Sequence, residues 1–187
     1  MPSAFAPRAA FAVLATVAIA CKHSEQSTPP PAVAATYYVG TTTTTSPDGA
    51  QPYGPAKTIA VRRTVDSAHD SIEELVVHPG EQFITTLQRR PGDAAVFAAG
   101  DRAGSFTGTV TFTGPEWAWT AWTYDIAMTD GSGELQGTGR LTAGSLDTDK
   151  LFISPDGQPR ARIHEHLEQV DETIYKSTRD QLLPPAQ

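Results

Sequence analysis

Apolar and polar residues alternate along most of the chain with a period of two. The alternation is clearest over residues 105–113, where Phe106, Val110 and Phe112 are separated by threonines and a glycine. Because successive side chains of a strand point to opposite faces of a sheet, this pattern predicts a strand with one buried and one wetter face. The run of threonines at 41–45 fits the same interpretation, since β-branched side chains favour strands over helices.

The same alternation predicts a β domain over residues 36–178, followed by a short tail at 179–187. Asp-Gly, Pro-Gly and Ser-Gly pairs mark turns between the alternating segments, and no segment carries a helical stripe that would predict a helix. We therefore predict an all-β fold, an antiparallel up-and-down meander that forms a small barrel or half-barrel. About nine strands are expected, at residues 36–45, 58–65, 71–77, 82–88, 105–113, 117–128, 135–141, 150–153 and 161–176.

The number and rhythm of these strands over residues 36–176 resemble those of the lipocalin-like, or calycin-type, small barrels. Glycines occur within or beside several predicted strands, at Gly104, Gly108, Gly137 and Gly139. A glycine inside a strand is unfavourable unless the sheet bends sharply or an aromatic ring lies over it. We expect both at the corners of a barrel, with tryptophans supplying the rings.

The three tryptophans of the chain all lie in one predicted strand, 117–128. Alternation places Trp117 and Trp119 on one face and Trp122 on the other, which predicts a strand buried on both sides for part of its length. Ligand pockets are mostly hydrophobic with a few polar groups. One hypothesis is therefore that Trp117, Trp119, Trp122 and Phe112 line a cavity for a small apolar ligand. The alternative is that these aromatic side chains fill the core and leave no room for a ligand.

The only cysteine, Cys21, follows an apolar run at residues 11–20 and precedes a polar, Pro-rich stretch. A lone thiol cannot form an internal disulfide, and this junction is where a processing enzyme would cut. The segment resembles a bacterial lipoprotein signal, with Arg8 as the n-region charge and Val17-Ala18-Ile19-Ala20-Cys21 as the lipobox. The resemblance implies that residues 1–20 are a signal peptide and that Cys21 becomes the lipidated first residue of the mature protein.

Lipidation would make the membrane a partner of this protein. The acyl chains attached in this family would anchor the chain durably, and residues 21–35 would form a flexible tether between the anchor and the folded domain. Lys22 occupies the position where the family's inner-membrane retention signal has Asp, so we expect an extracytoplasmic location at the outer membrane of a Gram-negative bacterium. The alternative is an ordinary secretory leader cut near Ala18 or Ala20. A transmembrane helix is disfavoured because crossing a bilayer needs about 20 apolar residues.

The balance of charge argues against some classes of partner. The chain has a formal net charge of −7, and loss of the leader, whose only charged side chain is that of Arg8, would make it one unit more negative. A protein of this charge is not expected to bind nucleic acid or anionic lipid through bulk electrostatics.

A possible metal site is the cluster of His164, His166 and Glu168. In a strand these three side chains lie on one face, and two imidazoles with a carboxylate can bind a divalent metal. The cupin family uses a similar His-x-His, but here Val170 stands where an acidic ligand would follow. The alternative is a solvated strand face, since Ile163 and Leu167 alternate toward the other side. We favour this alternative and expect no metal and no cofactor.

No motif of the sequence predicts an enzyme. The neighbouring carboxylates Glu73 and Glu74 point to opposite faces of a strand and cannot share a proton, and no Gly-x-Ser-x-Gly occurs. The leading hypothesis is a lipid-anchored barrel that binds a small apolar ligand. The alternative is a structural or interaction lipoprotein with a filled core, and a metal-dependent enzyme at His164 and His166 is the third.

Overall fold

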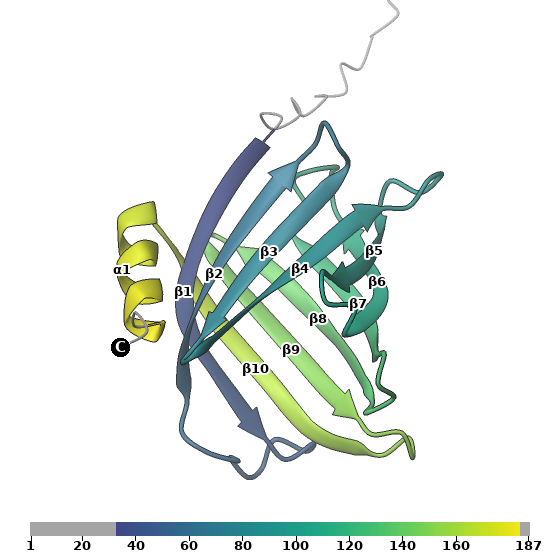
Figure 1. The fold of residues 1–187 in the computed structure, drawn as a ribbon, viewed down its shortest axis with the longest axis vertical. Coiled ribbons are helices and arrows are strands. Elements are labelled where there is room, and N and C mark those ends of the chain that lie inside the picture. Colours follow the sequence, from purple (N-terminus) through teal and green to yellow (C-terminus); the bar gives the residue numbers. More distant parts are fainter. Residues whose placement is uncertain (1–32, 184–187) are drawn as a thin grey trace, which may run out of the picture.

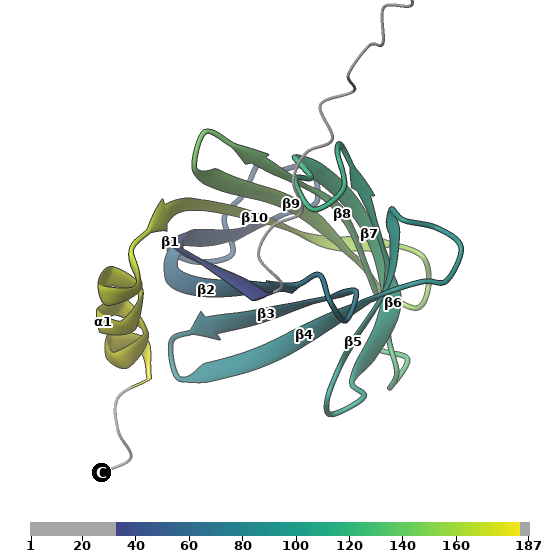
Figure 2. The same cartoon turned by 90° about the horizontal axis from the view of Figure 1, so that it is seen from above.

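Ten antiparallel strands close into a barrel (Figures 1 and 2). The computed structural model describes residues 33–183 of the chain. Each strand pairs with the next one along the sequence, and the first also pairs with the last, from Tyr37 opposite Val170 to Thr45 opposite Arg162. The predicted all-β, up-and-down meander is confirmed. Of the two predicted forms, the structure is the closed barrel.

The barrel is followed by a single short helix near the C-terminus. The bounds of the elements are β1 Val33–Thr45, β2 Lys57–Asp66, β3 Ser71–His78, β4 Glu81–Arg89, β5 Val96–Asp101, β6 Phe106–Thr113, β7 Ala121–Met128, β8 Glu134–Thr142, β9 Ser145–Ile153, β10 Pro159–Val170 and α1 Glu172–Leu182. Within residues 33–183, no helix combines the length and the apolar character needed to span a bilayer.

Several strand predictions differ from the structure. The strand predicted at 150–153 is β9, which begins already at Ser145. Strand β5 was not predicted, because its small residues Ala98, Ala99 and Gly100 hide the alternation of large apolar side chains. Strand β7 begins at Ala121 rather than at residue 117. Gly114 and Pro115 turn the chain before it, so the segment that carries the first two tryptophans is a loop.

The helix α1 replaces the last part of the predicted strand 161–176 and the first part of the predicted tail. Asp171 caps it, since the side chain of Asp171 accepts a hydrogen bond from the backbone N–H of Ile174 at 2.9 Å. Tyr175 is buried, and its ring lies 5.1 Å from that of Tyr37 between their centroids. The helix thereby covers the outer surface of β1, β2 and β3 near Ala60 and Val77.

The chain enters β1 at Val33, so residues 33–35 of the predicted tether belong to a strand. The predicted signal peptide 1–20, the lipidation site Cys21, the tether up to residue 32 and residues 184–187 lie outside the described residues. The barrel end at which β1 begins is the upper end in Figure 1.

The core lies inside the barrel and is densest at the upper end. Phe97 is completely buried, and its ring meets those of Phe112 and Trp119 edge to face at 5.2 and 5.3 Å between centroids. Arg89 covers this cluster, with its guanidinium 4.5 Å from the ring centroid of Trp117. This end of the barrel is therefore filled by side chains.

Two of the four glycines noted in the sequence, both in β8, make room for aromatic rings, one of a tryptophan as predicted and one of a tyrosine. At Gly108 a Cβ atom would meet Asp125 and Ile126 instead, and at Gly104 it would meet no atom within 4 Å. A Cβ atom at Gly139 would collide with the ring of Trp122, and one at Gly137 would lie 2.9 Å from the ring of Tyr124. Both rings come from the neighbouring strand β7 and lie across β8 inside the barrel. The glycines thus let the large side chains of β7 fold flat against the wall.

Candidate ligand-binding site

A cavity of about 810 Å³ occupies the lower part of the barrel. It opens where β1 ends and β2 begins, since residues around its mouth such as Tyr53 and Phe83 are 59% and 42% exposed. Phe112 and Trp122 are among the aromatic side chains at its inner end, next to the filled core. The cavity is therefore a one-ended pocket whose floor is the upper core.

One wall of the cavity is apolar. Strands β4, β6 and β7 supply most of it with large apolar side chains, and β8 adds Leu135. Its members include Phe83, Leu87, Phe106, Val110, Ile126 and Met128. Such a surface favours contact with an apolar molecule over contact with water.

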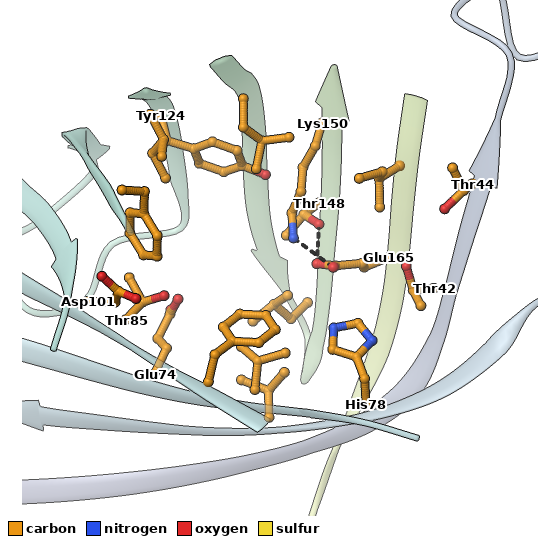
Figure 3. A pocket seen from close by; sticks show the side chains of 18 of the residues that line it. Thr42, Thr44, Glu74, His78, Thr85, Asp101, Tyr124, Thr148, Lys150 and Glu165 are labelled. Carbon is orange, nitrogen blue, oxygen red and sulfur yellow. Dashed lines mark hydrogen bonds and ion pairs between the residues drawn. The ribbon is translucent and has the colours of Figure 1, made fainter. Parts of the chain in front are cut away.

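The opposite wall carries a buried ion pair (Figure 3). Lys150 Nζ of β9 lies 2.6 Å from Glu165 Oε1 of β10, and Thr148 Oγ1 donates a hydrogen bond of 2.6 Å to Glu165 Oε2. The three side chains meet because Lys150 and Thr148 are both inward residues of β9, and Glu165 lies opposite Thr148 in the register. Burial raises the pKa of Glu165, but the nearby ammonium and the hydrogen bonds outweigh it and hold this pKa below its ordinary value.

Two further titratable side chains face the cavity close to this pair. Burial lowers the pKa of His78, so its imidazole is neutral at pH 7. Burial also raises the pKa of Tyr124, against a smaller opposing effect of the nearby Thr148 hydroxyl. The cavity thus presents a neutral imidazole from β3 and a neutral phenol from β7 close to a compensated ion pair.

A second ion pair lies near the floor. Arg63 Nη1 is 3.5 Å from Glu74 Oε1, and the Arg63 guanidinium lies 5.0 Å from the ring centroid of Trp122 and 5.3 Å from that of Phe112. The charge of Glu74 inside the barrel is therefore compensated. The Arg63 guanidinium packs on the rings of Trp122 and Phe112 at the inner end of the cavity. Glu74 lines the cavity, and its side chain is 25% exposed.

The four side chains predicted to line a cavity are divided by the structure. Phe112 and Trp122 line it, whereas Trp117 and Trp119 do not. The prediction for Trp117 and Trp119 was wrong because both precede β7, in a loop that packs them over the closed upper end. Trp119 is 7% exposed there, and its ring stacks on that of Phe112 at 4.5 Å between centroids.

The residues considered for a metal site lie on the outside of the barrel. His164, His166 and Glu168 are exposed, as expected for a solvated face of β10. His166 Nδ1 is 2.6 Å from Asp147 Oδ1, and this hydrogen-bonded carboxylate raises the pKa of the imidazole. Among residues 33–183, no three or more His, Cys, Asp or Glu side chains are placed to hold a metal ion together.

The wall formed by Thr148, Lys150 and Glu165, here called the polar wall, was not predicted from the sequence. Lys150 and Glu165 are charged, and charged strand residues are ordinarily assigned to the solvent face. The available signal was the period of two: Glu165 lies on the same side of the strand as Ile163 and Leu167, which were expected to face the core. Glu165 is only 7% exposed, so the phase of the apolar residues predicted its side correctly.

Comparison of the sequence with protein-family models finds no match, and comparison with curated proteins finds none either. Inferences about function therefore come from the barrel and its cavity.

Proposed function

We propose that this protein is a lipid-anchored extracytoplasmic lipoprotein whose barrel binds a small apolar ligand in its lower cavity. The observation that carries the proposal is a cavity of about 810 Å³ with one wall built from large apolar side chains. Pockets for small molecules have volumes of about 300–1,000 Å³ and combine apolar walls with a few polar groups. In this proposal the protein binds and releases its ligand unchanged and is not an enzyme.

Titration with apolar compounds tests the binding proposal. Trp122 lies in the cavity wall, so fatty acids, retinoids or haem that enter the cavity should change the tryptophan fluorescence. Trp122→Phe should remove much of this change, whereas Trp117→Phe, outside the cavity, should keep it. If no class of compound shifts the spectrum of the folded protein, the binding proposal fails and a filled-core interaction lipoprotein becomes the better hypothesis.

The anchor is supported by the sequence around Cys21. β1 begins at the upper end of the barrel, opposite the cavity mouth, so a tether at this end leaves the mouth free. The proposed location is the outer membrane of a Gram-negative bacterium. Intact-mass measurement of the native protein should find a chain that begins at Cys21 and carries added acyl mass. Cys21→Ala should release the protein from membranes, and a native chain with a bare thiol would overturn the anchor.

A further inference from the structure

The buried ion pair in the polar wall keeps hydrogen-bonding capacity that its own contacts do not use. An ammonium has three N–H donors and a carboxylate has about four acceptor positions. Within residues 33–183, Lys150 Nζ contacts only Glu165, and Glu165 accepts only from Lys150 and Thr148. Both charged side chains line the cavity. The remaining donors and acceptors are therefore placed side by side within reach of a bound molecule.

The charges around the cavity disfavour a ligand with a charge of its own. The charges that face the interior of the cavity are already compensated, since Glu165 is paired with Lys150 and Glu74 with Arg63. A ligand carboxylate at Lys150 would lie beside Glu165, and a ligand ammonium at Glu165 would lie beside Lys150. Either ion would lose its water without gaining an uncompensated partner, which is unfavourable in a buried site.

A neutral hydroxyl matches this arrangement. It donates one hydrogen bond and accepts others, so it can donate to Glu165 and accept from Lys150 at the same time without separating the pair. The phenol of Tyr124, close to the Thr148 hydroxyl, lines the same cavity. The apolar wall, which includes Ile126 and Met128, would contact the rest of the molecule.

We propose that the cavity selects apolar molecules with an uncharged hydroxyl head group, and that the head group binds at Glu165 and Lys150. This inference rests on the proposed function, because it assigns a ligand class to the same cavity. It distinguishes apolar alcohols from the fatty-acid-type anions that share the same apolar body.

Calorimetric titration with two matched pairs of compounds tests this assignment. The pairs are retinol with retinoate and dodecanol with dodecanoate, so that only the head group changes within each pair. We expect the alcohol of a pair that binds to bind at least about tenfold tighter than its carboxylate, a factor equivalent to one hydrogen bond to a charged group. A carboxylate that binds as tightly as its alcohol overturns the head-group assignment and leaves the proposed function intact. If none of the four compounds binds, the proposed function fails and the assignment fails with it.

Substitutions of the ion pair give the sharper test. Glu165→Gln leaves the Lys150 ammonium without its carboxylate, so the variant should bind the carboxylate at least about tenfold tighter than the natural protein does. The double variant Lys150→Met, Glu165→Gln has no charge at this position, so it should bind the alcohol more weakly than the natural protein does and should bind the carboxylate no tighter. Circular dichroism establishes that each variant is folded. If the single variant does not fold, the natural protein and the double variant decide the outcome.

Lys57→Gln is the matched control. It removes the other ammonium of the lining, on an exposed residue that is separated from Glu165 by Thr42 of β1 and forms no ion pair among residues 33–183. The alcohol-to-carboxylate preference should stay as in the natural protein. An unchanged preference in folded Glu165→Gln, or a changed preference in Lys57→Gln alone, would assign head-group selection to the mouth and overturn the proposal.

Discussion

The two ends of the barrel are built from the same strands but differ in what their inward side chains do. At the upper end β5 places Phe97 inside, and at the lower end the same strand places Asp101 inside. β1 likewise changes from Tyr38, which is buried in the core, to Thr42 and Thr44, which line the cavity. The cavity thus arises from side-chain choice along continuous strands rather than from a gap in the sheet. We expect stability to reside at the upper end and selectivity at the lower end.

The largest contrast should come from removing one phenylalanine at each end. Phe97→Ala empties a completely buried position, and loss of a buried Phe costs about 3–5 kcal/mol of unfolding free energy. Phe83→Ala, at a position 42% exposed beside the cavity mouth, should cost less than half as much. Urea unfolding measures both. Equal losses would show that the lower end contributes to stability as much as the upper core.

A methyl group added under Trp122 should also destabilise the barrel. Gly139→Ala places a Cβ atom against the indole, and overpacking of this kind costs about 1–3 kcal/mol. The tryptophan fluorescence should shift as well, because the ring must move. Gly54→Ala is the control, since its Cβ would meet no atom within 4 Å. A Gly139→Ala variant as stable as the Gly54→Ala variant would contradict the close packing of the ring on β8.

The ion pair of Lys150 and Glu165 should make the free energy of unfolding depend on pH in the acid range. The pKa of Glu165 is lower in the folded protein than in the unfolded chain, so its contribution is present above the unfolded pKa and is lost as the pH falls through the folded pKa. Denaturation measured from pH 6 downward should show a loss that begins near the ordinary Glu pKa of about 4.3. Glu165→Gln should flatten this part of the curve. A curve of identical slope in both proteins would rule out a lowered Glu165 pKa.

The smallest effect on the pH dependence of stability should come from replacing His78. Burial lowers its folded pKa, so the unfolded chain binds a proton more readily and stability falls as the pH drops below the ordinary His pKa of about 6.5. His78→Gln should remove this decline between about pH 6.5 and 5, a window above that of Glu165. His164→Gln, on the exposed outer face, is the control and should keep the decline. If His164→Gln removes the decline and His78→Gln keeps it, the assignment of the decline to His78 is wrong.

The fold could be predicted because the alternation of apolar and polar residues is a local property of each strand. Much of the candidate site could not be predicted from this alternation. Phe106, Val110 and Phe112 face inward as their alternation indicated. The helix α1 was missed because β10 alternates strongly up to its end. Periodicity gives no weight to Asp171, the capping residue that starts the helix. Trp117 and Trp119 depend on a loop that folds over the barrel end, which periodicity along a strand cannot describe.

The ion pair was missed for a different reason. Its stabilisation depends on register between two strands, which brings Lys150 beside Glu165, and pairing register is not written in either strand alone. The inward phase of Glu165 was visible in the sequence. What hid it was the general rule that charged residues face water, which fails where a partner is present.

The hydrogen bonding of β1 to β10 makes completion of the fold wait for the whole domain. The N-terminal strand lacks one of its two neighbours until the C-terminal strand has been synthesised, and α1 packs on β1 to β3 only after that. Such pairing between distant segments forms slowly, because a long loop must close first. The hairpins between consecutive strands can form as the chain emerges, but the barrel cannot close before β10 is present.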